Sequence, residues 1–570
     1  MTPHPRALVL VLVALAACAR ASTIAPAGTS AGATSADITE ADLRRRLFLI
    51  ADDSMMGRET GSEGAYKATE YIASEFRRLG LEPAGENGSY FQTVPFWRAA
   101  IGPRSRLEIT STPSMSVKRV SLELGRDWIP SSFRGEEVQL TGIDGTMIIY
   151  GGSLADTMRW IPASKAANQL VVLDFPDSMP PSALGPRLAR WRGAHAVALV
   201  ALHRFPAEEM ARLREGRPVA DTTRNRNVVP LIWISRSVAA TMFNGTLPTE
   251  PGAIGGLAFG GFDFPRTPVA FPARNVVAVL RGSDPALRGE YVALTAHNDH
   301  VGFDHSPVDH DSLRAFNQVV RPMGADSPVR PATPEETARI RTILDGLRRV
   351  HPPRLDSIRN GADDDGSGTV SILEIAERMA RGGERPRRSI LFVSHTGEET
   401  GLLGSRWYSD HPTVPRDSIV AEIDQDMIGR GTSHDFPRGG TGAGSDTYLE
   451  VIGAKRLSRA FGEMMEAANA RQPIPFVFDY TYDQPGHPLQ YYCRADHYSY
   501  ARYGIPSLAL SRGEHLDYHQ VTDEPQYISY RDLARVSRMV HDGALAIANA
   551  DARPALDAPK PADPNVACRQ

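Results

Sequence analysis

Short apolar runs separated by helix-like stretches fill the second half of the chain. The runs are NVVAVL at 275–280, EYVALTAH at 290–297, SILFVSH at 389–395, VAEID at 420–424 and SLALS at 507–511. Their length and their content of β-branched residues predict buried strands. A helical pattern such as that of 370–380 lies between them. The alternation predicts an α/β domain with a mixed, mainly parallel sheet flanked by helices, and ligands bind such sheets beyond the carboxyl ends of the strands.

The first half of the chain has two different patterns. Apolar residues recur at helical spacing from Ser62 to Leu79, and Gly80 follows where a helix C-terminal cap belongs, so a helix is expected there. Residues 120–265 instead carry recurring strand-like runs, at 146–150, 170–174, 196–201 and 229–234. We therefore expect residues 37–119 to belong to the main domain and residues 120–265 to form a separate, small β-rich unit.

The N-terminus resembles a bacterial export signal. Arg6 precedes an apolar run at 7–17, which is too short to span a bilayer and predicts a signal peptide. The run ends in LAA before Cys18 and resembles a lipobox, in which the cysteine is lipidated and becomes the mature N-terminus. Ala19 follows rather than Asp, which by analogy with bacterial lipoproteins favours the outer membrane. An ordinary signal peptide and release to the periplasm is the alternative.

We accordingly expect residues 1–17 to be a lipoprotein signal peptide. Residues 18–36 are rich in Ser, Thr, Ala and Gly, which predicts a flexible linker. Residues 551–570 are rich in Pro, Ala and Asp, which predicts a disordered tail. No other stretch is long and apolar enough for a transmembrane helix, so we expect contact with a membrane only through the lipid anchor.

Composition narrows the classes of function. The chain has 570 residues, more than one ordinary domain needs, with 42% hydrophobic and 23% charged residues, as in soluble globular proteins. The net charge is -4 and no basic block occurs, which argues against a nucleic-acid partner. Apart from Cys18 the only cysteines are Cys493 and Cys568, and the sequence leaves open whether these two pair.

Histidines and carboxylates gather at the ends of the predicted strands. They are His297, Asp364, Glu398, Glu399, Asp426 and His519. Two imidazoles with several carboxylates form a mixed nitrogen and oxygen ligand set that suits Zn²⁺, and a carboxylate can bridge two zinc ions. The chain has no HExxH motif, which excludes the common helix-borne site for a single zinc ion.

Residues next to the candidate ligands indicate which side chains orient a ligand, bind metal or move protons. Asp299 lies two residues after His297, on the same side of an extended chain, and can accept the second N–H of its imidazole. The adjacent acids Glu398 and Glu399 follow a buried strand, and we expect one to bind metal and the other to move protons. Both His515 and His519 follow the last strand, and their spacing does not decide which of them binds metal.

Residues 363–374 also fit the template of a calcium-binding loop that ends in Glu374. Such a loop needs an entering helix, but the preceding segment HPPRLDSIRNG contains two prolines and suits a turn. The chain has no second loop of this kind to pair with it. We therefore interpret the match as accidental and expect Glu374 to lie on a helix that leaves the site.

The motifs as a set indicate a family. AHNDH, NGADDDGSG, HTGEETGLLGS, EIDQDMIGR and LDYHQVTD carry the candidate ligands, and MGRETGSEGAYKATEYI, DSIRNGADD and ADHYSYARYGIPS accompany them. Residues 275–548 resemble the dizinc exopeptidase family that includes bacterial aminopeptidases, glutamate carboxypeptidases and glutaminyl cyclases. Residues 120–265 resemble a protease-associated domain, chiefly through NQLVVLDFP, WRGAHAVALVAL and VPLIWISRSVAATMF. We expect the zinc peptidase domain to cover 266–550, with an insertion at 303–355 that is a candidate lid.

The resemblance implies two zinc ions per chain that share one carboxylate. One ion would be held by His297, Asp364 and Asp426. The other would be held by Asp364, Glu399 and His519.

The resemblance also implies the remaining roles. Glu398 would be the general base, and Tyr518 would help to hold the oxyanion. The peptide bond before Asp365 would be cis. The chain departs from the family pattern in two places, because Asp365 stands where Asn is frequent and because the insertion at 303–355 is long.

These features together predict a metallo-exopeptidase that releases N-terminal residues from peptides. Peptide substrates are therefore its expected partners. Two alternatives of the same family stay open, a glutaminyl cyclase that uses one zinc ion and similar residues, and a carboxypeptidase. A non-catalytic, receptor-like module would be expected to lack ligands or the base, whereas all of them are present here. The preferred side chain and the oligomeric state are not predicted by the sequence.

Overall fold

The computed structural model describes residues 34–110, 119–131, 140–179, 184–205, 207–220, 229–328, 330–383, 385–431, 446–557, 559–566 and 568–570. Residues 36–570 form one compact unit, and the preceding unit falls almost wholly outside the described residues, as do Cys18 and the lipobox-like run. Within the described part of the chain, every helix is too short or too polar to cross a membrane.

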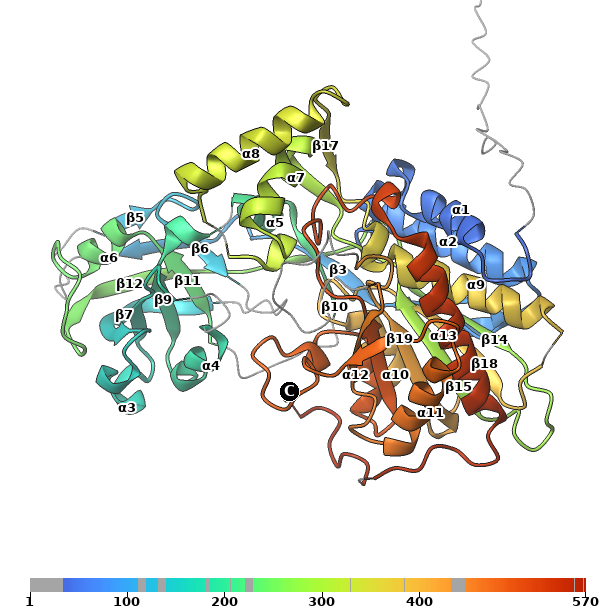
Figure 1. The fold of residues 1–570 in the computed structure, drawn as a ribbon. Helices are drawn as coiled ribbons and strands as arrows, with labels where there is room; N and C mark the ends of the chain where they lie inside the picture. The colour runs from blue at the N-terminus through green and yellow to red at the C-terminus, as the bar shows by residue number, and fades with distance from the viewer. Residues whose placement is uncertain are drawn as a thin grey trace, which may run out of the picture. The chain divides into compact units, whose positions relative to one another are not determined.

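The predicted mixed sheet is present and is mainly parallel at its centre (Figure 1). The strand order is β1-β14-β18-β15-β19-β22-β20-β21, and β2 pairs with β14 beside β1. The strands are β1 (Glu82–Pro83), β2 (Phe91–Val94), β14 (Ala273–Leu280), β15 (Tyr291–His297), β18 (Ser389–His395), β19 (Ile419–Gln425), β20 (Tyr448–Ile452), β21 (Val477–Asp479) and β22 (Ser507–Ser511). Strands β18, β15, β19 and β22 run parallel, so their carboxyl ends share one edge of the sheet.

Helices cover both faces of this sheet, which explains why its central strands are continuous apolar runs. On one face Val292 and Leu294 of β15 join a core shared with α1, α2, α9, α11 and α13, whereas Ala293 faces Tyr408 of α10 and Tyr500 of α12. The helices are α1 (Glu40–Ile50), α2 (Glu63–Arg78), α9 (Gly368–Arg381), α10 (Leu403–Asp410), α11 (Arg459–Ala470), α12 (His497–Ala501) and α13 (Tyr530–Asn549). The expected fold class is confirmed.

Helix α2 shows how closely local sequence specifies the N-terminal segment. The Ser62 hydroxyl caps the helix by accepting the Ala65 N–H, and Gly80 follows the helix with a φ of 73°. The apolar positions Ala68, Ile72 and Phe76 are fully buried against the main core. The predicted helix is therefore present, and it attaches the N-terminal segment to the sheet.

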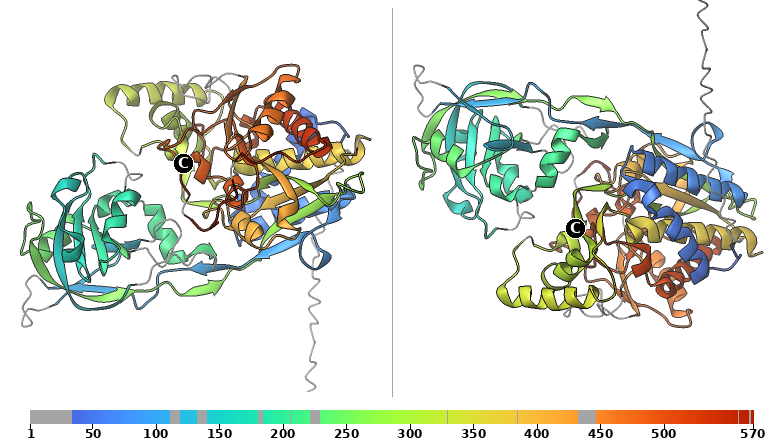
Figure 2. Two further views of the ribbon diagram at one scale, coloured as in Figure 1. Left: turned by 90° about the horizontal axis from the view of Figure 1, so that it is seen from below. Right: turned by 90° about the horizontal axis from the view of Figure 1, so that it is seen from above.

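A second sheet contains the strand-like runs expected between residues 120 and 265 (Figure 2). Its order is β5-β4-β12-β7-β8-β9-β11-β6, and the strands are β4 (Arg106–Ile109), β5 (Val120–Leu122), β6 (Trp128–Ser131), β7 (Leu140–Ser153), β8 (Leu170–Asp174), β9 (Ala196–Val200), β11 (Leu231–Ile234) and β12 (Ile254–Phe262). Helices α3 (Ala163–Ala166), α4 (Leu184–Leu188), α5 (Ala207–Glu215) and α6 (Arg236–Met242) accompany it. Since β4 belongs to this sheet, the β-rich unit begins before residue 120.

A three-stranded sheet joins a strand from within the β-rich unit to two segments that flank that unit in sequence. It consists of β3 (Phe96–Ala99), β10 (Arg217–Ala220) and β13 (Arg266–Pro268), with β3 in the centre. Both pairings are antiparallel.

The insertion 303–355 has regular structure of its own. Strands β16 (Phe303–Asp309) and β17 (Leu355–Ile358) pair, and helices α7 (His310–Val320) and α8 (Pro334–Leu347) lie between them in the chain. Helix α8 begins with a capping box formed by Thr333 and Glu336. Helix α7 was not expected from the sequence. Arg314 of α7 forms a 2.7 Å ion pair with Asp517, so the insertion contacts the segment that leads to His519.

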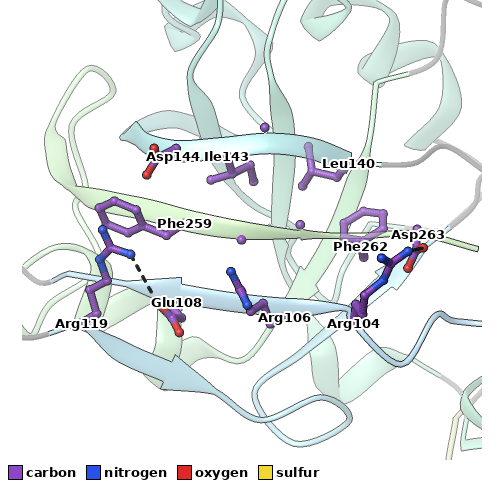
Figure 3. Close-up of a pocket in the computed structure, with 13 residues that line it drawn as sticks. Arg104, Arg106, Glu108, Arg119, Leu140, Ile143, Asp144, Phe259, Phe262 and Asp263 are labelled. Carbon is purple, nitrogen blue, oxygen red and sulfur yellow. Dashed lines mark ion pairs between the residues drawn. The ribbon is translucent and has the colours of Figure 1, made fainter.

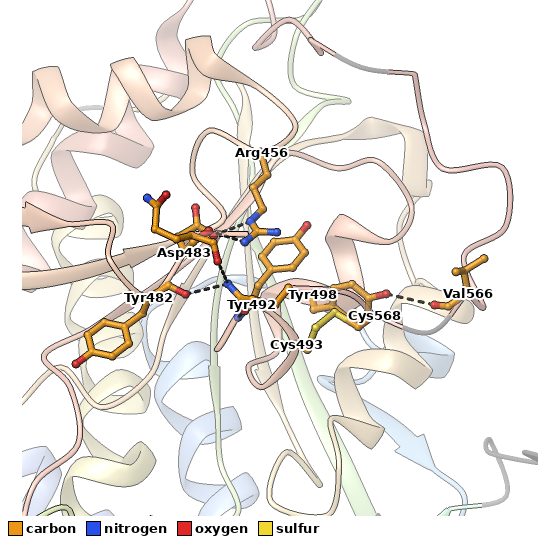
Figure 4. The surroundings of a disulfide bond; sticks show 10 residues. Arg456, Tyr482, Asp483, Tyr492, Cys493, Tyr498, Val566 and Cys568 are labelled. Carbon is orange, nitrogen blue, oxygen red and sulfur yellow. Dashed lines mark hydrogen bonds and ion pairs between the residues drawn. A yellow bond between two sulfur atoms is a disulfide. The ribbon is translucent and has the colours of Figure 1, made fainter. Parts of the chain in front are cut away.

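The structure differs from the expected disordered tail. Cys568 forms a disulfide with Cys493 (Figure 4). The sequence had left open whether these two cysteines pair. The Gln570 side chain donates a 2.9 Å hydrogen bond to the Tyr482 carbonyl and accepts one of 2.9 Å from the Tyr492 N–H. The tail therefore docks on the loop that precedes α12.

Candidate metal centre

The parallel strands bring the predicted site residues to one edge of the sheet. His297 is the last residue of β15, Glu398 and Glu399 follow β18, and Asp426 follows β19. His519 lies in the loop after β22. Side chains that are far apart in sequence therefore converge, as expected for the carboxyl ends of parallel strands.

Asp364 lies between the two predicted histidine ligands. Its Oδ1 is 3.1 Å from His297 Nε2, and its Oδ2 is 3.0 Å from His519 Nε2. The peptide bond from Asp364 to Asp365 is cis, as the family resemblance implies. A carboxylate with one oxygen toward each histidine has the arrangement of a bridging ligand.

On the first side of Asp364, donor atoms of His297, Asp365 and Asp426 lie within 4.8 Å of one another. The Asp426 Oδ1 is 3.6 Å from His297 Nε2. Asp365 is less suited to bind metal, because its oxygens already accept the His297 N–H at 3.0 Å and the Gly368 N–H at 2.8 Å. The family resemblance implies His297 and Asp426, together with Asp364, as ligands on this side, and the structure brings these three side chains together.

On the second side, donor atoms of His300, Asp364, Glu399 and His519 lie within 4.8 Å of one another. The Glu399 carboxylate is 2.9 Å from His519 Nε2 through Oε2 and 2.7 Å from His300 Nδ1 through Oε1. His300 was not among the residues predicted from the sequence. The available signal was its position in AHNDH, three residues after His297.

Unpaired buried atoms test whether this donor set fits a cation. Some of these atoms lie about 3 Å from one another, but none of them forms a properly oriented hydrogen bond within the described residues, namely His297 Nε2, Asp364 Oδ2, Glu399 Oε1, Asp426 Oδ1 and His519 Nε2. Burying such atoms without a partner costs free energy. Because they converge from both sides of Asp364, and because imidazole and carboxylate are zinc ligands, the residues fit zinc.

Asp299 contacts two residues of the site, His297 and Glu398. The His297 Nδ1 is 3.1 Å from the Asp299 carbonyl oxygen and 3.7 Å from its Oδ1, so it has the backbone carbonyl as its closer partner. The Asp299 carboxylate accepts the Glu398 N–H at 3.2 Å and the Thr60 hydroxyl at 2.9 Å. Asp299 thus orients His297 mainly through its carbonyl and fixes the turn that carries Glu398.

Glu398 lies near the metal-ligand groups but belongs to neither of them. Its Oε2 is 4.0 Å from His297 Nε2. Burial raises the pKa of the Glu398 carboxyl well above its usual value, against the opposing effect of His297. A carboxylate beside the ligands that is not itself a ligand is suited to proton transfer.

The structure distinguishes the two histidines that spacing left open. The His515 Nε2 is 3.2 Å from the Asp363 carboxylate, and His515 belongs to neither donor group. His519 joins Asp364 and Glu399, and its ring stacks on Tyr518 with 4.0 Å between centroids. His515 therefore supports the loop of Asp363, whereas His519 is the candidate ligand.

Glu374, the last residue of the calcium-loop match, lies away from the donor groups. It is on α9 and accepts a 2.6 Å hydrogen bond from the buried guanidinium of Arg46. It thus takes part in helix packing, as expected from the sequence.

A pocket of about 590 Å³ on the β-rich unit is unrelated to this centre (Figure 3). Its lining includes Arg104, Arg106 and Phe259, and the guanidinium of Arg119 stacks 3.5 Å from the Phe259 ring centroid. None of the lining residues belongs to either donor group.

Comparison with known proteins is consistent with the geometry. Residues 275–544 match the model of Peptidase family M28, and the matched segment contains every residue of both donor groups.

Leucine aminopeptidase 1 of the fungus Paracoccidioides brasiliensis (strain Pb18) is 32% identical over 190 residues, 31% of this chain and 44% of that protein. Leupeptin-inactivating enzyme 1 of Streptomyces exfoliatus is 37% identical over 78 residues, 13% of this chain and 18% of that protein. The chain thus spans less than half the length of these relatives.

Solved structures to which the chain is similar include the aminopeptidase from Aneurinibacillus sp. strain AM-1. It has a TM-score of 0.49 and 15% identity, with 89% of this chain and 93% of that chain covered. The zinc aminopeptidase BSAP from Bacillus subtilis has a TM-score of 0.47 and 17% identity, with 90% of this chain and 95% of that chain covered.

Proposed function

We propose that this chain is a zinc-dependent aminopeptidase with two zinc ions, which releases N-terminal residues from peptides. The observation that carries the proposal is Asp364, which directs one oxygen to His297 and the other to His519. Asp426 completes one ligand set and Glu399 the other. The match of residues 275–544 to a peptidase family and the aminopeptidases among the relatives support the same activity.

His300 would join the second set, because its Nδ1 is directed at Glu399. When bound, the zinc ions would polarise the peptide carbonyl and lower the pKa of a water molecule.

Proton transfer falls to Glu398 in this proposal. Its carboxylate takes a proton as the water oxygen bonds to the carbonyl carbon, and it returns that proton to the nitrogen as the C–N bond breaks. The products are a free amino acid and a peptide shortened by one residue. Tyr518, which stacks on His519, is the candidate donor to the oxyanion by its resemblance to the family.

The experiment is digestion of short peptides by purified protein, followed by mass spectrometry over time. We expect release of single N-terminal residues, while N-acetylated copies of the same peptides remain intact. Chelation should abolish the activity and added Zn²⁺ should restore it. Loss of ammonia from N-terminal Gln peptides without shortening would instead identify a glutaminyl cyclase, and shortening from the other end a carboxypeptidase.

A further inference from the structure

The insertion 303–355 contacts a short segment that leads directly to the candidate zinc ligand His519. The segment consists of Leu516, Asp517 and Tyr518. From α7, the Asn317 side-chain amide donates to the Leu516 carbonyl at 3.0 Å, and the Arg314 guanidinium lies 2.7 Å from the Asp517 carboxylate. Asn317, Leu516 and Asp517 are buried, and hydrogen bonds away from water are electrostatically stronger.

The turn after α7 contacts the backbone of the third residue of this segment. The Ala325 N–H donates to the Tyr518 carbonyl at 3.0 Å. Gly324 packs so closely that a Cβ there would lie 2.5 Å from the Tyr518 carbonyl oxygen and 2.8 Å from its nitrogen. Because backbone atoms cannot be approached that closely by a side chain, only glycine fits here without moving the segment.

His519 needs such support because of its backbone conformation. Its φ is 55°, in the left-handed region, which is uncommon for a residue with a side chain. Conformations of this kind persist where the surrounding contacts fix them. The imidazole must also point at Asp364 and Glu399, whose oxygens lie 3.0 and 2.9 Å from its Nε2. A shift of the preceding segment would therefore move the Nε2 away from the other ligands on the second side of Asp364.

The two sides of the metal centre differ in how their ligands are held. His297 ends β15 and Asp426 directly follows β19, and these two strands are neighbours in the sheet. The sheet thus fixes both of these ligands on the first side. His519 instead lies in the loop after β22, so its position depends on what packs against that loop.

The main domain also contacts the segment, which limits the effect of a single lost contact. The Asp517 carboxylate accepts the Thr522 hydroxyl at 2.6 Å and lies 3.1 Å from the Arg430 guanidinium. Removal of Arg314 alone therefore leaves Asp517 with two partners. Gly324 offers the sharper test, because a methyl group there acts on the Tyr518 backbone itself.

We infer that the insertion holds His519 in the position that binds the second zinc ion, with Gly324, Asn317 and Ala325 as positioning residues. This role rests on the proposed zinc-dependent function. It makes the insertion part of the support of the metal centre, whereas a lid would only cover the site.

The first test compares Gly324→Ala with Gly346→Ala, at a glycine on α8 of the same insertion. At Gly346 the nearest atom to an added Cβ is the Arg349 Nη2 at 3.6 Å, so a methyl group fits. We expect Gly324→Ala to weaken binding of one zinc ion about 10- to 100-fold, as loss of support for a ligand does. The other ion and the Gly346→Ala protein should be unaffected. Titration of the demetallated proteins with Zn²⁺ measures both affinities.

Two unchanged affinities in a folded Gly324→Ala protein would overturn the inference. Equal weakening of both ions would overturn it as well, because His519 contributes to one side only. An unmodified protein that binds no zinc would reject both the proposed function and this role. Asn317→Ala, which removes one hydrogen bond without adding bulk, replaces Gly324→Ala if thermal melting shows that the latter does not fold. It should weaken the same ion roughly 2- to 10-fold, the size of one net hydrogen bond.

The second test separates support of the metal centre from the role of a lid. At limiting Zn²⁺, Gly324→Ala should lower kcat by the same factor for Leu p-nitroanilide and for a tetrapeptide that begins with Leu. Excess Zn²⁺ should restore most of the rate. A lid would instead change KM for the longer substrate alone. Such a length-dependent change, with zinc binding and kcat unaltered, would overturn the inference and leave the proposed aminopeptidase function intact.

Discussion

Substitution of Glu398 separates proton transfer from metal binding. The Glu398 carboxylate lies 4.0 Å from His297 Nε2 but belongs to neither ligand set. Its position is fixed through its backbone N–H, which donates to Asp299. Glu398→Gln keeps the shape of the side chain and this backbone contact but cannot accept a proton. We therefore expect the metal ligands to keep their places while the chemical step fails.

The size of the effect follows from the role. General acid–base residues contribute roughly 10²–10⁴-fold to rate, which at about 1.36 kcal/mol per tenfold is about 3–5 kcal/mol in the activation free energy. The loss should appear in kcat, with KM changed only a few-fold, because the contact with the transferred proton is made in the reaction and not in substrate binding.

The assay pairs kinetics with elemental analysis. Glu399→Gln is the matched control, since the Glu399 carboxylate lies 2.9 Å from His519 Nε2 and is a candidate ligand. It should lose zinc, whereas Glu398→Gln should retain it. A Glu398→Gln protein with full zinc and a near-normal kcat would refute the assignment of the base.

Four further substitutions test other parts of the structure. His300→Ala should weaken zinc binding about 10- to 100-fold, as loss of an orienting or ligating group does, which metal titration measures. Arg58→Ala should lower zinc content similarly, because its guanidinium holds the carbonyls of the loop before Asp364. Arg46→Ala should cost about 3–5 kcal/mol of unfolding free energy in denaturant titration, since it leaves Glu374 buried and unpaired. Cys18→Ser should release the protein from membranes if the lipobox-like run directs lipidation, and unchanged fractionation and maturation would favour a plain signal peptide.

The main sheet and its ligand edge could be predicted because local patterns specify them. Each residue of β15 and β18 is buried, since helices cover both faces, and such strands appear in a sequence as uninterrupted apolar runs. Residues just past several of these runs then meet at one edge, so the sequence alone is enough to group His297, Glu399 and Asp426.

Other features depend on contacts between distant segments, so the local sequence gives little indication of them. His300 is directed at Glu399 only because β15 and β18 are neighbours in the sheet. Helix α7 begins at the Asp309 side chain, which caps it by accepting the Ser312 N–H, but its sequence lies in a stretch rich in Pro, Asp and Arg. The ordered tail depends on Cys568, whose partner Cys493 could not be assigned from spacing.

Arg58 shows that a residue outside the family match supports the candidate metal centre. This buried side chain donates to the carbonyl oxygens of Asn360 at 2.6 Å and Gly361 at 2.9 Å, and to that of Asn298 at 3.1 Å. It therefore connects the residue after His297 to the loop before Asp364, although it lies outside the family match at 275–544. Three backbone carbonyls around the site accept hydrogen bonds from this one side chain, so the N-terminal segment helps to hold the site. Strands β1 and β2 also pair with β14, so segments on both sides of the β-rich unit in sequence share one sheet.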